Sequence, residues 1–190
     1  NQISIYGVDG EQNQPISNNT FTTDNLAIDY SGAGNTFISS DVYGIYAFGR
    51  IFNDVISQNN FVNSCYDNSK YVYGLYLISN SSKANISSNV FTDLTNSVFI
   101  ENSTLINFEN NHLELTNNYQ YLANNHQLFV INSNSLIIKG NTITATHPNN
   151  LGGVNDAIRL MNCSTSEINQ NSLNGFNIGL IILECSSLNV

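Results

Sequence analysis

The chain has 190 residues, of which 10% are charged, and 14 Asp and Glu against 5 Lys and Arg give a formal net charge of -9. Such an acidic chain lacks the basic surface that binds phosphates, so nucleic-acid binding is excluded. No run of about 18 apolar residues is present, so no membrane span is predicted. The length fits one domain over residues 1–190. Because the sequence starts at Asn1 and stops part-way through a repeat, we interpret it as a fragment or a processed part of a longer chain.

A short hexad recurs along the chain, with an apolar residue at each end and Asn third from its end. The hexads are Ile56–Phe61, Ile86–Phe91, Phe108–Leu113, Ile138–Ile143 and Ile168–Leu173. Their marker residues, Asn59, Asn89, Asn111, Asn141 and Asn171, follow one another at steps of 30, 22, 30 and 30. An internal repeat of this length predicts a solenoid in which each unit stacks on the next.

A second motif alternates apolar residues with others, which is the side-chain period of a β-strand. These apolar strands start at Ile45, Leu75, Val98, Leu128, Ile158 and Leu180. Gly, Asn and Ser at the strand ends leave no room for helices. A unit of about 22 residues cannot bury its own apolar face, whereas stacked units share a continuous core. The sequence therefore predicts an all-β protein, a parallel β-helix of about seven coils.

The spacing also predicts where the loops lie. From each strand start to the next marker Asn the distance is 13 or 14 residues, whereas from the Asn to the next strand start it ranges from 9 to 17. Loop inserts at residues 62–74, 114–127 and 144–157 are therefore expected to leave from one corner of the coil. Loops held on a rigid scaffold often carry binding or catalytic residues.

The marker Asn residues are expected to stack inside the coils. At a strand spacing of about 4.8 Å, identical amides can bond to one another along the column. Asn also tolerates the left-handed backbone of a tight bend. A second column of this kind is predicted at Asn102, Asn132 and Asn162. Cys163 and Cys185 occupy equivalent places in successive coils, and stacking as small buried residues is favoured over a disulfide bridge.

The segment Gly74–Phe91, GLYLISNSSKANISSNVF, resembles the repeat of right-handed parallel β-helix proteins of the pectate-lyase-like superfamily, an apolar strand followed by a polar bend and N-x-I. The resemblance covers roughly Ile16–Val190 and implies a right-handed coil. That superfamily includes polysaccharide lyases, hydrolases, epimerases, tailspikes, adhesins and noncatalytic proteins, so the fold alone does not select a function. The paired Asp and Gly-His-Gly of its hydrolases and the Asp-Pro-His of its epimerases are missing here.

The outward face of the apolar strands suggests a binding surface. Arg159 and Glu101 must point outward, because charged residues are rarely buried unpaired. Two outward columns follow, first Tyr46, Tyr76, Phe99, Phe129, Arg159 and Ile181, and second Phe48, Ile78, Glu101, Ile131, Met161 and Leu183. Ten of these twelve are apolar or aromatic, more than a monomer usually leaves bare. Three explanations stay open: the inserts cover the face, a protein partner or second copy packs there, or the rings form a platform for carbohydrate.

The candidate ligand-binding residues are Tyr46, Tyr76, Phe99 and Phe129 of the strands, with Tyr119 and Tyr121 of the second insert. The candidate catalytic residues are Lys70, His126, Asp156 and Arg159. Breaking or inverting a uronic acid needs a base and a cation, which these side chains supply. A glycoside hydrolase would instead pair Asp156 with Glu101 or Glu114. No cluster has metal-ligand spacing, so no cofactor is predicted, although loop carboxylates are compatible with Ca²⁺.

The sequence therefore predicts, first, a surface or secreted binding module that recognises carbohydrate or a protein partner through the aromatic strand face and adjacent loops. The alternative is a polysaccharide-modifying enzyme, a lyase, epimerase or hydrolase. A second alternative is a structural shaft of an adhesin or tailspike-like protein. Convergence of Lys70, Arg159, His126 and Asp156 in one place would favour the enzyme, whereas scattering would disfavour it.

Overall fold

The computed structural model describes residues 20–23, 36–39, 43–48, 55–63, 73–78, 84–116, 124–146 and 154–190. For residues 20–48, and for Asn124 and Val154, it describes the backbone only. Every regular element in these ranges is a β-strand, and none of the described residues is helical. The all-β prediction is confirmed.

All strand pairs in the described ranges are parallel, and the strands form three sheets. Sheet A carries the apolar strands, in the order β18-β15-β12-β9-β6-β3. Its members are β3 (Tyr43–Phe48), β6 (Tyr73–Ile78), β9 (Asn96–Glu101), β12 (Asn124–Ile131), β15 (Val154–Met161) and β18 (Ile178–Leu183). Sheet B contains β1 (Thr20–Thr23), β2 (Thr36–Ser39), β5 (Asn60–Asn63), β8 (Val90–Thr92), β11 (His112–Leu115), β14 (Thr142–Ala145) and β17 (Ser172–Asn174).

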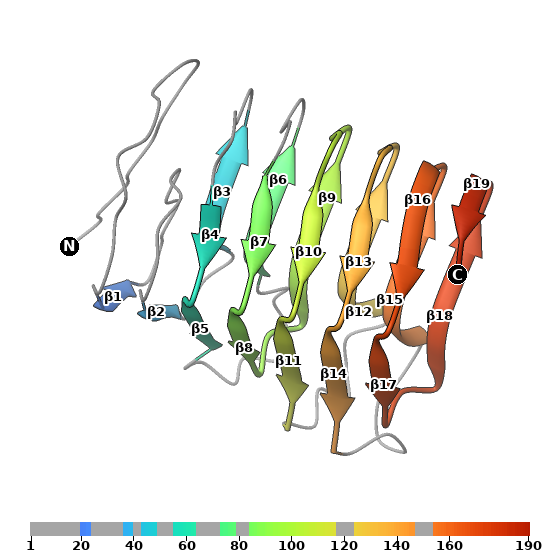
Figure 1. The fold of residues 1–190 in the computed structure, drawn as a ribbon. Helices are drawn as coiled ribbons and strands as arrows, with labels where there is room; N and C mark the ends of the chain where they lie inside the picture. The colour runs from blue at the N-terminus through green and yellow to red at the C-terminus, as the bar shows by residue number, and fades with distance from the viewer. Residues whose placement is uncertain are drawn as a thin grey trace.

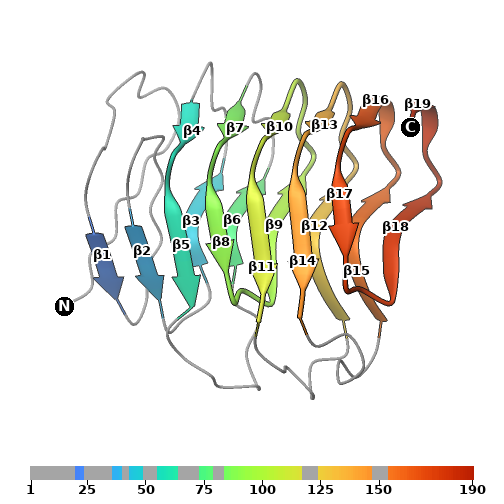
Figure 2. The same ribbon diagram turned by 60° about the horizontal axis from the view of Figure 1, so that its bottom comes forward.

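Sheet C completes each coil between sheets A and B. It contains β4 (Val55–Ser57), β7 (Asn85–Ser87), β10 (Asn107–Glu109), β13 (Ile137–Lys139), β16 (Ser164–Asn169) and β19 (Ser186–Asn189). From β3 onward the chain visits sheets A, C and B in turn, and from β5 onward each strand pairs with the strand three places earlier. Figures 1 and 2 show the resulting stack of rungs along one axis, with the chain running from one end to the other. The repeat therefore builds a parallel solenoid-like stack.

The core lies inside the coils, where the inward residues of all three sheets meet. The register places each apolar motif residue over its equivalent in the next coil, as in Leu75 beside Val98 and Leu128 beside Ile158. These side chains are fully buried, and the stacked rings of Phe61 and Phe91 lie 4.7 Å apart in the same core. Stacking thus buries apolar area that a single coil would leave exposed, which is the main stabilising contribution.

The predicted column of buried Asn residues is confirmed. Asn111 Oδ1 accepts hydrogen bonds from the backbone N–H and from Nδ2 of Asn89, both at 3.0 Å, while Asn111 Nδ2 donates to the Ile86 carbonyl at 2.9 Å. The same pattern joins Asn141 to Asn111 and Asn171 to Asn141. The left-handed residue is, however, the one before the marker, at Gln58, Ser88, Asn110, Gly140 and Gln170. The marker Asn therefore bonds between coils rather than forming the bend itself.

The second Asn column differs from the first. Asn102, Asn132 and Asn162 do have left-handed backbones, with φ of 49°, 51° and 50°, but their side chains are exposed. Asn162 Nδ2 donates a hydrogen bond to Asn132 Oδ1 at 2.8 Å, so the predicted stacking is confirmed for this pair. The predicted burial is wrong, because this bend turns the side chains toward solvent. The buried column at this bend is the next residue: Ser103 N–H donates to Ser133 Oγ, and Cys163 N–H to Cys185 Sγ. Both cysteines are free, as favoured from the sequence, and Cys65 lies outside the described residues.

Candidate functional site

The strands of sheet A carry an irregularity near their start. Side chains three residues apart should lie on opposite faces of a strand. Yet the rings of Tyr73 and Tyr76 are 4.9 Å apart, those of His126 and Phe129 are 5.1 Å apart, and Arg159 contacts Asp156. The register pairs His126 with Asp156 and Leu128 with Ile158 but omits the residues between. One additional residue, as in a β-bulge, thus brings a further side-chain column to the outer face.

Three of the four candidate catalytic residues converge at this irregularity. Asp156 is fully buried, and its Oδ2 atom accepts hydrogen bonds from Arg159 Nε at 3.0 Å and Nη2 at 2.7 Å. His126 Nδ1 lies 3.1 Å from Oδ1 and 3.0 Å from Oδ2 of the same carboxylate. The guanidinium compensates the buried carboxylate, which would otherwise be costly to desolvate. We call these three residues the polar cluster.

A residue of the preceding coil helps to hold the polar cluster in place. The backbone N–H of His126 donates to Asn96 Oδ1 at 2.9 Å, and the His126 side chain is only 7% exposed. Asn96 occupies the position on β9 that is equivalent to His126 on β12, one coil earlier. Its side chain therefore fixes the backbone of His126. Asp156 then orients both the imidazole and the guanidinium, and neither can rotate without breaking these bonds.

Hydrogen-bonding capacity remains on the outer side of the cluster. Arg159 uses Nε and Nη2 on Asp156, and its other N–H groups have no acceptor among the described residues. His126 uses Nδ1 and has no partner at Nε2 within the same ranges. Both lie beside Phe129, with Arg159 Cζ 6.0 Å from the ring centroid. An imidazole oriented by a carboxylate, next to a cation, has the chemistry needed to move a proton and stabilise an anion.

The sequence placed His126 and Asp156 in the loop inserts, and that prediction is wrong. His126 lies on β12 and Asp156 on β15, because these strands begin before the apolar alternation does. Lys70 lies outside the described residues. The hydrolase pairings are not favoured, since Asp156 is already bonded to Arg159 and His126, and Glu114 belongs to sheet B, with its carboxylate 3.8 Å from His112 Nε2.

The candidate ligand-binding rings form a continuous row on sheet A. Tyr76 and Phe99 stack with centroids 4.6 Å apart and planes at 18°, and Phe129 meets Phe99 edge to face at 5.3 Å. Tyr73 joins this row through Tyr76, a contact that only the three-residue offset reveals. For Tyr46 only the backbone is described, and Tyr119 and Tyr121 lie outside the described residues.

The described outward residues of sheet A are partly exposed. Tyr76, Phe99, Phe129 and Arg159 are half-buried, unlike the fully buried inward residues that alternate with them. The second column is half-buried as well, at Ile78, Glu101, Ile131 and Met161, and Leu183 is 44% exposed. We call this surface, formed by the two outward columns of sheet A, the sheet A face.

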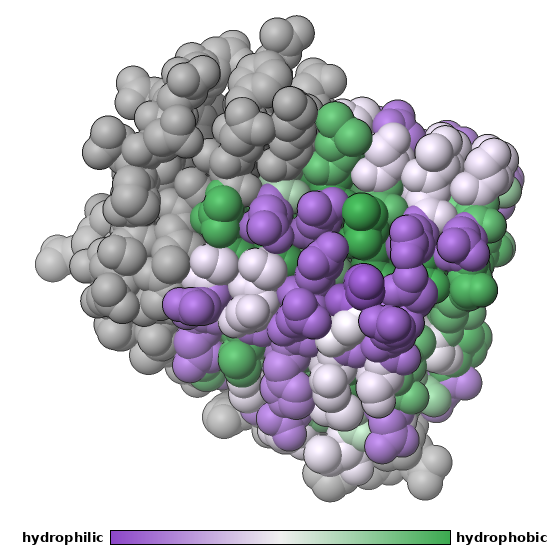
Figure 3. Space-filling model, in the orientation of Figure 1, coloured by the Kyte–Doolittle hydropathy of each residue, from purple (hydrophilic) through white to green (hydrophobic). Residues whose placement is uncertain are grey.

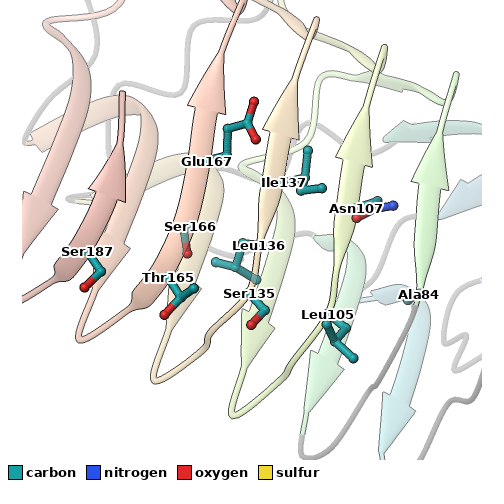
Figure 4. Close-up of a pocket in the computed structure, with 10 residues that line it drawn as sticks. All are labelled: Ala84, Leu105, Asn107, Ser135, Leu136, Ile137, Thr165, Ser166, Glu167 and Ser187. Atoms are coloured by element: carbon teal, nitrogen blue, oxygen red, sulfur yellow. The ribbon is translucent and has the colours of Figure 1, made fainter.

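A groove at the bend between sheets A and C was missed by the sequence analysis. It has a volume of about 570 Å³ and is lined by Leu105, Asn107, Ser135, Ile137, Thr165, Glu167 and others shown in Figure 4. Left-handed residues, Leu105, Ser135, Thr165 and Ser187, form one wall. Figure 3 shows that the surface over the front strands of Figure 1 is mainly hydrophilic, with separate hydrophobic residues. Glu167 is the one charged residue in the lining, so this groove offers no catalytic set.

Within the described part of the chain, no three His, Cys, Asp or Glu side chains are grouped as a metal site. The same residues include no helix of the length and apolarity needed to span a bilayer. Comparison with known proteins gave no match, whether by family model, by similarity to curated proteins or by similarity to solved structures. Function must therefore be argued from the geometry of the sheet A face and the polar cluster.

Proposed function

We propose that the protein is a right-handed parallel β-helix of the pectate-lyase-like kind, with about seven coils, that acts as a surface or secreted binding module. The three parallel sheets, the stacked coils and the Asn column support this architecture. The binding surface is the sheet A face, and the partner is a protein.

The ring geometry of the sheet A face carries this proposal. Tyr76 and Phe99 stack with their planes nearly parallel, so each ring covers one face of the other. A sugar ring packs against an open aromatic face, and this stacking reduces the area of that kind. A face that combines aromatic and aliphatic side chains with few charges is instead typical of the centre of a protein interface.

The size of the face agrees with a modest affinity. Six strands about 4.8 Å apart and about 20 Å long give an area on the order of 500 Å². That lies within the range of about 300–600 Å² for the largest apolar patch of a typical monomer and below the roughly 800 Å² per partner of a standard interface. We expect a weak contact, which repetition on a surface would strengthen through avidity.

Site-specific cross-linking tests the proposal. A photoreactive amino acid replaces Phe99 on the sheet A face, and the matched control carries it at Thr144, which is half-buried on the outer side of sheet B. Cells or extracts of the producing organism, together with the purified chain itself, serve as the partner pool. Protein adducts from position 99 but not from position 144 are expected. Equal adducts from both positions, or none from position 99, would overturn the proposal.

A second candidate function is recognition and modification of a polysaccharide by the polar cluster. The observation that favours it is the convergence of His126 and Arg159 on Asp156, with unused donors beside Phe129. His126 Nε2 would act as the base, and Arg159 would stabilise the anion that forms. Pectin, alginate and neutral glycans, with and without Ca²⁺, are incubated with the wild type and with His126→Gln. Product that disappears in the variant supports this function, whereas no product from any glycan excludes it.

A further inference from the structure

The groove at the bend between sheets A and C runs along the stack of coils. Its first wall is a column of equivalent residues in successive coils, namely Leu105, Ser135, Thr165 and Ser187. Its second wall is a column of sheet C, in which the register aligns Asn107, Ile137 and Glu167. Figure 4 shows both columns. The three coil steps from Leu105 to Ser187, each about 4.8 Å, give the groove a length of about 14 Å.

The backbone of the first wall is bonded within the stack. Leu105 N–H donates to the Asn134 carbonyl at 3.2 Å. In the next coil, Ser135 N–H donates to the Ser164 carbonyl at 3.1 Å. A peptide that binds as an added strand needs the free backbone groups of a sheet edge. The wall offers no such edge, so recognition in the groove depends on side chains.

Hydroxyl groups are repeated along the groove and are free to bind a ligand. Those of Ser135, Thr165 and Ser187 make no hydrogen bond to any described residue. On the second wall, Glu167 Oε1 accepts a hydrogen bond from Asn169 Nδ2, and Oε2 has no partner within the described ranges. Each hydroxyl can donate and accept, and the carboxylate accepts. The groove therefore matches a ligand that carries many hydroxyl groups.

Aliphatic side chains lie among these polar groups. Leu105 is 46% exposed, and Ile137 is half-buried in the neighbouring column. Between the two walls, Leu136 is buried and closes the floor. A pyranose ring has the same combination of surfaces, since its C–H groups are apolar and its hydroxyl groups surround them.

The charge of the groove limits the ligand further. None of the described residues that line it is Lys or Arg, and Glu167 is the one charged side chain among them. The whole chain carries a formal net charge of -9. A polymer with carboxylate, sulfate or phosphate groups would be repelled and would meet no cation in the groove. The ligand is therefore uncharged.

We propose that the groove binds a neutral glycan chain that lies along the stack, at a site separate from the sheet A face. A pyranose ring is about as long as the coil rise of about 4.8 Å, so about three rings fit. Their C–H groups pack against Leu105 and Ile137. Their hydroxyl groups bond to Ser135, Thr165 and Glu167. The volume of about 570 Å³ is typical of small-molecule sites, which span roughly 300–1,000 Å³.

Amide NMR spectra of the isotopically labelled full chain test this inference. The chain is titrated with cellotriose, maltotriose and mannotriose, and trigalacturonate is the acidic counterpart. We expect at least one neutral trisaccharide to shift the signals of Ser135, Thr165 and Glu167 at millimolar concentration. Trigalacturonate should bind at least about tenfold more weakly, because its carboxylates face Glu167 and the acidic chain.

Ser135→Leu should abolish these shifts, because the larger side chain fills the groove and removes a hydroxyl. The backbone accepts leucine there, since Leu105 occupies the equivalent position with φ of 57°, against 54° at Ser135. Thr165→Leu rests on the same precedent and provides a second variant. The matched control is Ser172→Leu, at an exposed position of sheet B, which should bind like the wild type. Circular dichroism and thermal unfolding confirm that each variant folds.

The outcomes separate this inference from the two candidate functions above. Absence of shifts with every neutral trisaccharide overturns it, and so does equal binding by the wild type and Ser135→Leu. Tighter binding of trigalacturonate would also overturn it. Shifts confined to His126, Phe129 and Arg159 would overturn the groove site and support the polysaccharide-modifying function. Cross-links from position 99 test the protein-binding function alone, so either proposal can fail without the other.

Discussion

Arg159 Nη2 lies 2.7 Å from Oδ2 of Asp156, three residues earlier on the same strand. A regular strand would direct these two side chains to opposite faces. The same offset joins Tyr73 to Tyr76 and His126 to Phe129, so it belongs to the repeat and not to one coil. With the same backbone arrangement, the coils of β6, β12 and β15 therefore hold an aromatic pair, an imidazole beside a ring, and an ion pair. The scaffold is constant and the chemistry changes from coil to coil.

Asp156→Ala should destabilise the fold strongly. The substitution leaves the Arg159 guanidinium and His126 Nδ1 without their acceptor in a nearly buried position, and breaking a buried ion pair costs about 3–5 kcal/mol. Since the Arg159 side chain is 16% exposed, we expect a loss of about 2–4 kcal/mol in the free energy of unfolding by urea. Glu109→Ala, at a half-buried residue without an ion pair among the described side chains, is the control and should change stability by less than about 0.5 kcal/mol. Equal effects would contradict the assigned role of Asp156.

Asn111→Ala should cost more than Asn171→Ala. Asn111 is fully buried, and its removal leaves two donors of Asn89 and the Ile86 carbonyl without partners. Each unsatisfied buried group costs about 1–3 kcal/mol, so a total loss of at least about 3 kcal/mol is expected. Asn171 makes similar bonds but is partly exposed, and water can replace them. Urea unfolding of both variants measures the difference, and a larger effect at Asn171 would contradict the stacked-amide account.

The stacking could be predicted because the repeat is visible in the sequence itself. Marker residues such as Asn89 and Asn111 recur at fixed steps, and the alternation that starts at Leu75 fixes which side chains point inward. Both features depend only on the spacing of residues along the chain, and the observed strand register agrees with them. The outward positions of Tyr76, Phe99 and Phe129 follow from the same alternation.

The polar cluster could not be predicted in the same way. The additional residue at Gln127 and Ala157 shifts the alternation, so that His126 and Asp156 lie outside the apolar pattern and resemble loop residues. Their contacts depend on an offset of three residues, which neither a strand period nor a repeat length encodes. The exposure of the Asn side chains at the bends could not be predicted either. Asn102 and Asn89 are the same residue type, and only the local backbone decides which one faces solvent.

Gly175→Ala should severely destabilise the chain. Gly175 has φ of +81°, and a Cβ atom there would lie 1.8 Å from the Ala145 carbonyl oxygen, so backbone in the neighbouring coil would have to move. A loss of more than about 3 kcal/mol, or failure to fold, is expected. Gly179→Ala is the control, because its Cβ would meet Leu173 Cδ1 at 3.5 Å, an ordinary contact. Similar thermal midpoints for the two variants would contradict this packing.

Stability should fall at alkaline pH because of Cys163. Burial raises the pKa of its thiol from 9.0 to about 11, and the side chain is 1% exposed. Below pH about 9 the thiol is protonated in both the folded and the unfolded chain, so its contribution to stability is complete. As the pH rises from about 9 to about 11, the unfolded chain releases this proton while the folded chain retains it, so the free energy of unfolding decreases.

The comparison with Cys163→Ser isolates this effect from other groups that titrate in the same range. Ser occupies the equivalent positions 103 and 133, where its hydroxyl bonds to the carbonyl two residues earlier, as the Cys163 thiol does. The variant should therefore fold and lack the thiol titration. Urea unfolding between pH about 8 and 11 should show the wild type losing about 2 kcal/mol more than the variant. Parallel pH profiles for the two chains would show that the Cys163 thiol ionises equally easily in the folded and unfolded states.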